Sequence, residues 1–323
     1  MRAVLILIPV AAVALSGGCT WLNRLTQRDD RQQQPAGEFA PKTAPELVGY
    51  LNRQAAAVNS IRYPNVSIHV SSPDLPGGSA SLGDSWLVCA KPRYFFLNGG
   101  KAVMGDMVKV GSNETEFWMH TKGGIGSDPQ LVYCAHTDLP KAANKLPIPF
   151  DPDWAMAALG MVEYNADPAN YKVDDNAAQF THTLVTGGQT PDGRGVVREV
   201  VFNAGENIGN RPRVRQHIVR DANTKQVIAR ADVKKVTRVN GGVEIPTQVV
   251  LEWPPQKFKM ELDLSRPEVN EKITDADMRN WFARPTVRDL TPINLATAQF
   301  RPSSYRGATP SDSRPRGFFG SRR

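Results

Sequence analysis

The sequence predicts a mainly β protein of the α+β class, built around an antiparallel sheet. Apolar and polar residues alternate with a period of two over two long stretches, 66–120 and 196–264, and turn residues separate the alternating runs. Helical periodicity is confined to one segment before the first stretch and a short one between the two. We therefore expect two series of strands with helices to cover them.

The first helix is expected to begin after Thr43, because Glu46 follows three residues later at the capping-box spacing. An apolar stripe then repeats at helical spacing. Its members are Leu47, Leu51, Ala55 and Val58. We expect this helix to end near Asn59.

The first strand series follows the helix. Strands are expected at 66–70, 86–90, 94–97, 107–110 and 116–120, with turns at Gly99-Gly100 and Gly111-Ser112-Asn113. The segment 94–97 is apolar on both faces. Residues 121–150, rich in Gly, Pro and Lys, are interpreted as an insertion or long connection.

A short helix is expected over 153–159, opened by Asp151-Pro152 and closed by Gly160, and 167–175 is interpreted as a loop. The second strand series is expected at 196–202, 214–220, 227–239, 243–253 and 258–264. In the last of these, apolar and charged residues alternate strictly, which is typical of an antiparallel sheet with one solvated face. Thr274 is expected to cap a short segment after it.

The N-terminus has the pattern of a secretory signal over 1–18. Arg2 precedes an apolar stretch too short to cross a bilayer, for which a helix needs about 20 residues. Small residues then lead to Cys19, and this resembles the lipobox of bacterial lipoproteins, although Ser16 stands where that pattern has a large apolar residue. The resemblance implies lipidation of Cys19 with a diacylglyceryl group. The alternative is an ordinary signal peptide that contains a cysteine.

We divide the mature chain into a flexible tether at 19–41, a folded domain at 42–290 and a disordered basic tail at 291–323. The formal net charge of +7 favours anionic surfaces, and the basic tail is a candidate contact for anionic lipid or cell-wall polymer. The alternative for the tail is a solubilising end. Nucleic acid is discounted as a partner because the signal directs the chain out of the cytoplasm.

The two other cysteines, Cys89 and Cys134, are expected to form a disulfide, since export allows one; two buried free thiols are the alternative. A zinc site formed by Cys89, His120, Cys134 and His136 is disfavoured, because Cys134 and His136 are closer in sequence than structural zinc ligands usually are. The sequence has no Gly-x-Ser-x-Gly elbow, P-loop or His-Glu-x-x-His helix. We therefore expect no catalytic residues, no metal and no cofactor.

Four segments carry a family resemblance. They are the helix at 45–58 leading into Val66-Ser67-Ile68-His69-Val70, the strand–Pro–strand run at 86–96, Glu116-Phe117-Trp118-Met119, and Gly242-Val243-Glu244-Ile245-Pro246-Thr247. Their order from 45 to 282 resembles the LolA/LolB-like family, the lipoprotein-localisation carriers of the cell envelope. The resemblance implies a strongly curved antiparallel half-barrel sheet with covering helices, and an apolar cavity between them that holds acyl chains.

Candidate lining residues for that cavity come from the apolar strand faces, and for each of them plain core packing is the alternative. They are Trp86, Val88, Phe96, Phe117, Met119, Val249, Leu251, Phe258, Met260 and Leu262. The predicted function is a non-catalytic envelope lipoprotein that binds acyl chains of lipids or lipoproteins. The alternative is a membrane-anchored structural or sensor protein with a filled core, which binds a protein or an anionic cell-wall partner. Thr20 after Cys19 indicates the periplasmic face of the outer membrane, by the sorting rule of the relatives.

Overall fold

In a computed structural model of the chain, the described residues are 39–101, 105–122, 128–142, 145, 151–190, 193–204, 213–239 and 242–298. The chain divides into two compact units, Met1–Phe39 and Ala40–Arg323, and the second is described here. The predictions on the signal segment, Cys19 and the Arg-rich part of the tail lie outside the described residues.

One sheet dominates this unit. Its first strands are β1 (Ser60–Ser71), β2 (Ser79–Ala90), β3 (Tyr94–Lys101), β4 (Gly105–Ser112), β5 (Glu116–Thr121) and β6 (Gln130–Ala135). The second series is β7 (Lys172–Asn176), β8 (Thr181–Gln189), β9 (Gly195–Asn203), β10 (Val214–Asp221), β11 (Val227–Val239), β12 (Val243–Trp253) and β13 (Phe258–Ser265). Two short strands follow, β14 (Glu268–Val269) and β15 (Ile293–Asn294).

The helices are short apart from the first. They are α2 (Ala44–Ala56), α3 (Leu139–Ala142), α4 (Pro152–Ala158) and α5 (Asp275–Asp277), the last continuing into the π-helical turn η7 (Met278–Phe282). The 3₁₀ turns are η1 (Pro76–Gly78), η2 (His136–Asp138), η3 (Pro168–Asn170), η4 (Ala177–Gln179) and η6 (Pro254–Gln256). The helix predicted after Thr43 is confirmed, and the Thr43 N–H donates to Glu46 Oε2 at 2.8 Å.

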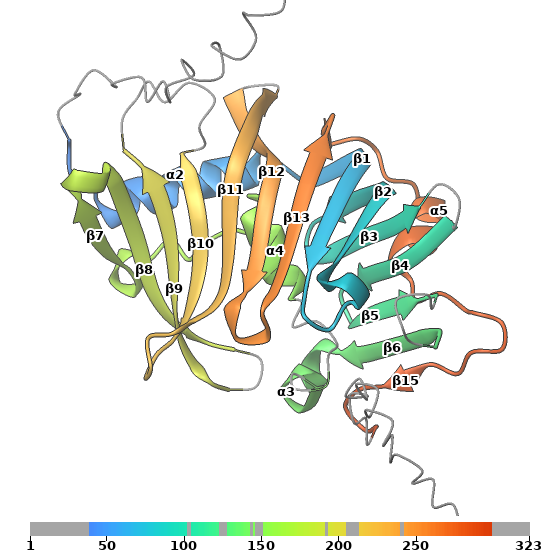
Figure 1. Ribbon diagram of the computed structural model, residues 1–323. Helices are drawn as coiled ribbons and strands as arrows, with labels where there is room; N and C mark the ends of the chain where they lie inside the picture. Colours follow the sequence, from blue (N-terminus) through green and yellow to red (C-terminus); the bar gives the residue numbers. More distant parts are fainter. Residues whose placement is uncertain are drawn as a thin grey trace, which may run out of the picture. The chain divides into compact units, whose positions relative to one another are not determined.

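The two predicted strand series are two antiparallel meanders joined into one sheet (Figure 1). The order is β15-β6-β5-β4-β3-β2-β1-β13-β12-β11-β10-β9-β8-β7, with β14 beside β1. The last long strand of the second meander, β13, pairs with β1, the first strand of the first. All pairs are antiparallel except β15 with β6.

The sheet is strongly curved and open, as the family resemblance implies. In Figure 1, β8–β13 run steeply, whereas β3–β6 run across the view. The change of direction falls at β1 and β2, whose pairing shifts register between Tyr63 and Val66. Pro64, which has no N–H for the ladder, lies in that bulge, and bulges bend and twist a strand.

The helices α2 and α4 both cover the inner face of the sheet. Cross-strand partners share a face, and one row runs through Leu184, Val200, His217, Ala231, Leu251 and Met260. The helix α2 packs on Leu184 and Val200 at one end of this row. The helix α4 packs near Leu251, and its Trp154 ring lies 5.6 Å from the ring of Trp253.

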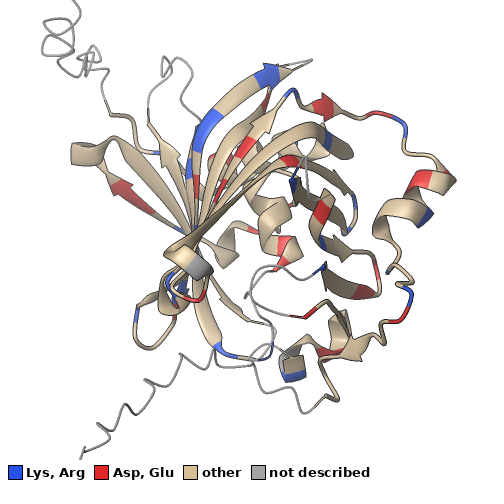
Figure 2. Ribbon diagram, turned by 45° about the vertical axis from the view of Figure 1, so that its right-hand side comes forward, with Lys and Arg blue, Asp and Glu red and all other residues tan. Residues whose placement is uncertain are grey.

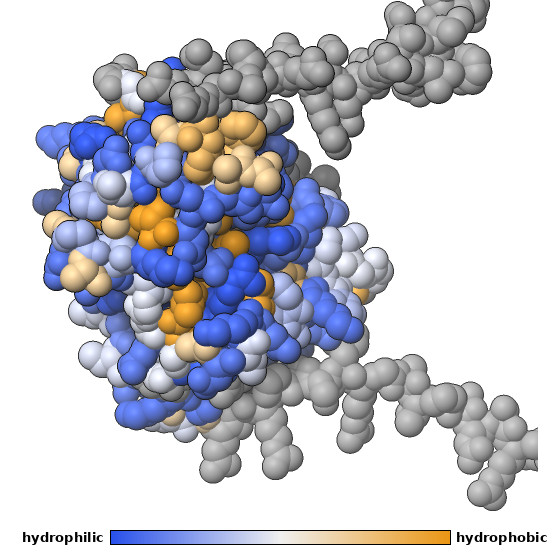
Figure 3. All heavy atoms as spheres, turned by 90° about the vertical axis from the view of Figure 1, so that its left-hand side faces the viewer, coloured by the Kyte–Doolittle hydropathy of each residue, from blue (hydrophilic) through white to orange (hydrophobic). Residues whose placement is uncertain are grey.

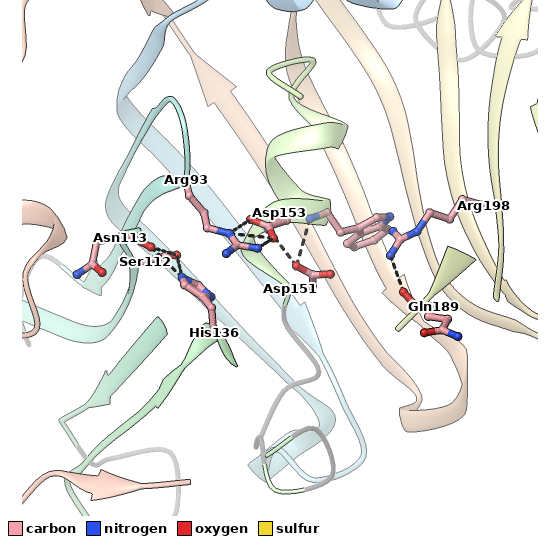
Figure 4. A network of polar contacts seen from close by, with 9 residues as sticks. Arg93, Ser112, Asn113, His136, Asp151, Asp153, Gln189 and Arg198 are labelled. Carbon is pink, nitrogen blue, oxygen red and sulfur yellow. Dashed lines mark hydrogen bonds and ion pairs between the residues drawn. The ribbon is translucent and has the colours of Figure 1, made fainter. Parts of the chain in front are cut away.

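Polar contacts fix the start of α4 (Figure 4). Asp151 caps the helix by accepting from the N–H groups of Asp153 and Trp154 at 3.0 and 3.3 Å. The Asp153 carboxylate in turn accepts from Arg93 Nε at 2.8 Å and from Arg93 Nη2. Since Arg93 stands between β2 and β3, this ion pair ties α4 to the first meander.

The outer face of β2–β6 is covered by the chain after β14. Trp118 donates its indole Nε1–H to the carbonyl of Phe282 at 3.3 Å, and both side chains are 1 % exposed. Further along, β15 pairs with β6 and Leu295 is fully buried. The predicted domain boundary at 290 is therefore wrong, because the fold continues to at least Ala298.

Several predicted turns and loops are strands. Gly99-Gly100 belongs to β3 and Gly111-Ser112 to β4, while β7 lies in the predicted loop at 167–175 and β6 in the predicted insertion at 121–150. Gly111 has a packing role: a Cβ atom there would lie 2.2 Å from Trp118 Cζ2. This glycine therefore marks a close approach of a ring to the backbone, and not a turn.

We expect Gly111→Ala to lower the free energy of unfolding by about 1–3 kcal/mol, because the added methyl overpacks against Trp118. Urea unfolding followed by tryptophan fluorescence measures this change. The matched control is Gly187→Ala in β8, where the new Cβ meets nothing within 4 Å; it should change stability by no more than about 0.5 kcal/mol. Equal losses in both variants would contradict the role assigned to Gly111.

Candidate functional site

A pocket of about 280 Å³ lies between α2 and the ends of β8 and β9. We call it the α2 pocket. Its lining comes from the start and middle of α2, from β8 and β9, and from the residue before β10. These residues are Lys42, Glu46, Leu47, Tyr50, Arg53, His182, Phe202, Asn203, Ala204 and Arg213.

The floor of the α2 pocket is apolar. The predicted stripe of α2 packs on the inner face of the sheet, where Leu47 and Phe202 belong to one buried cluster. The rings of Tyr50 and Phe202 are 6.1 Å apart and nearly perpendicular. This end of the pocket can therefore bury hydrocarbon.

Tyr50 is a fixed wall of the pocket. Its hydroxyl donates to Glu244 Oε2 at 2.9 Å, and Arg238 pairs with the same carboxylate at 3.2 Å. Burial, and then the charge of Glu244, raise the pKa of Tyr50 well above its usual range. The phenol therefore stays protonated near neutral pH and serves as a hydrogen-bond donor, not as an acid–base group.

The rim of the α2 pocket is positive. Lys42 lies 3.6 Å from Glu46, the acid that also completes the capping box. Arg53 and Arg213 form no ion pair with any described residue, and Arg213 Cζ lies 5.8 Å from the centre of the Tyr50 ring. On the face at the β7 edge, small apolar patches lie among hydrophilic side chains (Figure 3). An apolar floor with cations at its edge fits an amphiphile that carries negative charge.

A second pocket, of about 60 Å³, lies beneath α4, and we call it the α4 pocket. It is lined by Trp154, Ala157, Tyr164, Tyr171, Leu184, Thr186, Arg198, Glu199, Val200, His217, Ile218 and Val219. Its His217 is 5 % exposed, and burial lowers the pKa of this imidazole to about 4. His217 is therefore neutral at neutral pH.

The outer face of the second meander is solvated, as the alternation in 258–264 predicts. Neighbouring strands there carry opposite charges (Figure 2), for example Arg220 and Glu199, whose Nε and Oε1 are 2.7 Å apart. Lys259 and Glu261 on β13 are 2.5 Å apart. Such partly exposed ion pairs contribute little to stability. The hydrophobic core of the second meander therefore lies on the inner face of the sheet.

The ten predicted cavity residues do not line one site. Seven belong to the main core cluster: Phe117, Met119, Val249, Leu251, Phe258, Met260 and Leu262. The other three, Trp86, Val88 and Phe96, lie on the opposite face beneath the C-terminal segment, so their assignment to the same cavity is wrong. None of the ten lines either of the two described pockets.

The predicted disulfide is also wrong, because Cys89 and Cys134 are both buried free thiols. They stand in one row across the sheet, separated by Phe95, Ser112 and Phe117 on three intervening strands. Strands are about 4.8 Å apart, so the two cysteines are about 19 Å apart along the sheet. A disulfide needs Cα atoms within about 7 Å.

Two of the four residues considered for zinc have other surroundings. His136 Nε2 lies 2.8 Å from the carbonyl oxygen of Asn113 and 3.4 Å from Ser112 Oγ (Figure 4). Cys89 is far from Cys134 along the sheet. Among the described residues, no group of three or more His, Cys, Asp or Glu side chains is placed to hold a metal ion.

Comparison with known proteins gives matches in structure alone: no protein-family model and no curated protein sequence matches the chain. A proposed outer membrane lipoprotein-sorting protein domain from Vibrio parahaemolyticus is similar at 8 % identity and a TM-score of 0.43, over 73 % of this chain and 96 % of that one. A LolA superfamily protein from Nitrosomonas europaea is similar at 11 % identity and a TM-score of 0.43, over 73 % and 97 %. A DUF1329 family protein from Desulfovibrio piger is similar at 9 % and 0.40, over 72 % and 94 %.

These likenesses are loose, and the half-barrel architecture is described by the strand order, curvature and covering helices of this chain itself. In the part of the chain that the structure describes, no helix is long and apolar enough to cross a membrane.

Sequence reasoning missed most of the pocket residues. Leu47 stands on the predicted stripe of α2, but Arg53 and Arg213 are ordinary surface cations in the sequence. Arg198 and His217 interrupt the apolar alternation of β9 and β10. This interruption is the feature of the sequence that could have indicated a pocket at these strands. Polar residues at inward positions of a sheet either pair with each other or face a cavity.

We expect Cys89 and Cys134 to be unreactive in the folded protein and fully reactive after unfolding without reductant. Both thiols are buried, and burial raises the pKa of each, that of Cys89 most strongly. Alkylation with iodoacetamide in native buffer and in guanidinium, followed by peptide mass spectrometry, measures this. A peptide pair linked through these two cysteines would contradict the assignment.

We expect His217 to make stability depend on pH between about 6.5 and 4. The pKa is about 4 in the folded protein and about 6.5 in the unfolded chain, so the unfolded chain binds the proton first. Stability is therefore full above about pH 6.5 and falls as the pH decreases towards 4, by up to about 3 kcal/mol.

Urea unfolding of the wild type and of His217→Gln at several pH values isolates this effect as a difference. His69→Gln, at an exposed position of β1, is the control and should follow the wild type. Parallel curves for the wild type and His217→Gln would show that the buried imidazole titrates normally.

Proposed function

We propose that this chain is a non-catalytic protein of the bacterial cell envelope that binds lipids or lipoproteins, with the α2 pocket as the site for an anionic amphiphile. The observation that carries the proposal is the combination of an apolar floor with a positive rim in one pocket. Leu47, Tyr50 and Phe202 supply the floor, and Arg53 and Arg213 stand at its edge.

The size of the α2 pocket supports partial burial of a ligand. About 280 Å³ is near the lower end of small-molecule sites, which span roughly 300–1,000 Å³. Each buried methylene contributes about 0.8 kcal/mol, so a few methylenes on the floor supply several kcal/mol. We infer that one segment of an acyl chain enters and that the remainder stays outside or in the membrane.

The charge of the rim supports an anionic ligand. Glu46 is paired with Lys42 and with the Thr43 backbone, which leaves Arg53 and Arg213 available. Charge-assisted contacts from arginine to carboxylate or phosphate are stronger than neutral ones. The apolar floor supplies affinity, and the arginines select for negative charge.

The predicted lipidation of Cys19 supports a place at the membrane. An anchored domain whose pocket accepts amphiphiles would meet its ligand at the bilayer surface. The outer membrane remains our expectation for the compartment, since Thr20 follows Cys19.

We expect Arg213→Glu to weaken binding of dansyl-undecanoate by about tenfold or more, because a contact to a charged group is worth about 1.5–3 kcal/mol. Fluorescence titration of the purified full chain measures the dissociation constant. The matched control is Arg215→Glu, two residues further on, which is also exposed but lines neither described pocket. Equal affinities for the two variants would remove the α2 pocket from the proposal.

A second candidate function is favoured by the tight packing of the predicted cavity residues. The seven inner ones are at most 9 % exposed, as expected of a filled core. On this reading the protein is an anchored structural or sensor protein that binds a protein or an anionic cell-wall polymer. Native mass spectrometry of the protein extracted from membranes separates the two: bound lipid supports the first function, and an empty protein supports the second.

A further inference from the structure

The α4 pocket contains polar groups that the hydrogen bonds of the fold leave unused. Trp154 is 6 % exposed, and its indole Nε1–H has no hydrogen-bond partner in the described part of the chain. His217 is 5 % exposed and neutral at neutral pH. Both side chains line the same cavity. Because buried polar groups are almost always paired, the unused indole N–H of Trp154 beside this polar cavity points to a ligand.

Arg198 brings a positive charge to this cavity. It extends from β9 towards the start of α4 (Figure 4) and is half-buried on the inner face. One hydrogen bond is described for it, from Nη2 to the carbonyl of Gln189 at 3.5 Å. A guanidinium group has five N–H donors, so most of its donors remain available to a bound group.

Tyr164 adds a neutral donor beside Arg198. Burial, and then the neighbouring Tyr171, raise the pKa of Tyr164 well above its usual range, while the charge of Arg198 acts in the opposite direction. The hydroxyl is therefore protonated at neutral pH. No hydrogen bond from it to a described residue is formed.

The acids near the cavity already have partners. Asp151 accepts from the two N–H groups that begin α4. Glu199 is a lining residue, but its side chain lies on the outer face of the sheet, where Oε1 is 2.7 Å from Arg220 Nε. The groups left to meet a ligand are therefore neutral, apart from the positive charge of Arg198.

We propose that the α4 pocket binds a small oxyanion group, a carboxylate or a phosphate, held by Arg198, the Trp154 indole N–H and the Tyr164 hydroxyl. A water molecule needs about 10–15 Å³ of such space, so about 60 Å³ holds a group of a few heavy atoms and excludes a sugar or an acyl chain. The site shares no lining residue with the α2 pocket and does not depend on the function proposed for that pocket.

The test uses the indole N–H resonance of Trp154 in the ¹⁵N-labelled full chain, identified by its loss in Trp154→Phe. The probes are inorganic phosphate, octanoate and octyl phosphate, with neutral octyl glucoside as the control ligand. We expect the anions to move this resonance saturably. Trp118, whose Nε1–H is bonded to the Phe282 carbonyl, is the internal control and should not move.

Arg198→Gln should weaken binding by about tenfold to a hundredfold, because it removes a charged donor. Tyr164→Phe, which removes only the hydroxyl, should weaken it by several-fold. Arg215→Gln, an exposed arginine on the same strand as His217, should bind as the wild type does. If circular dichroism shows that Arg198→Gln does not fold, Arg198→Lys and Tyr164→Phe decide the matter.

The probes also separate the sources of the anion. A response to phosphate and to both octyl anions supports a site for a free anion or a headgroup alike, and a response to the octyl anions alone supports a lipid headgroup. No movement of the Trp154 resonance with any anion, or an equal movement with octyl glucoside, would overturn the proposal. The proposal would also be overturned if Tyr164→Phe and the folded Arg198 variant both bound the anions with the affinity of the wild type.

Discussion

The pairing of β1 with β13 is the interaction on which the rest of the structure depends. It joins seven consecutive residues on each strand, Asn65–Ser71 with Lys259–Ser265, and so merges two meanders that are far apart in sequence. The hydroxyl of the fully buried Tyr63 donates to the carbonyl of Pro246 at 2.9 Å and fixes β1 against the second meander. Without this pairing each meander would expose a strand edge.

The merged sheet is not covered in the same way along its length. Over β2–β6 both faces are buried, the inner one in the main core and the outer one under the chain after β14. Over β8–β13 the outer face carries ion pairs and meets solvent. The helices α2 and α4 then have a single face to cover, and pockets arise where these short elements leave the inner face incompletely filled.

Local chemistry allowed much of this to be predicted. The spacing of Thr43 and Glu46 predicted the first helix, and the alternation in 258–264 predicted a strand with one solvated face. Both predictions depend on interactions between residues that are close in the sequence. The family resemblance predicted the curvature of the sheet. The sequence alone could not show that Cys89 and Cys134 stand four strands apart, since that distance depends on the register of every strand between them.

The same limit explains the errors in the candidate site. Trp86, Val88 and Phe96 are apolar, as cavity residues should be, but an apolar residue on a strand with two buried faces does not reveal which face it occupies. Gly99 and Gly111 suggested turns because glycine is common there, whereas the side chains of neighbouring strands require their lack of a Cβ atom. Both errors concern partners that are distant in the sequence.

The position of the two pockets follows from the composition of one row of the sheet. At β12 and β13 the inner-face row consists of Leu251 and Met260, which belong to the main core cluster. Neither of these residues lines a described pocket. Towards β10 and β9 the inner face gains His217 and Arg198, which cannot be packed against hydrocarbon without a cost in free energy. Since the described residues leave these groups with few partners, a dense core is unfavourable at this end of the sheet. The binding of a polar group that we propose is therefore placed at β8–β10, and the remaining strands support this end of the sheet.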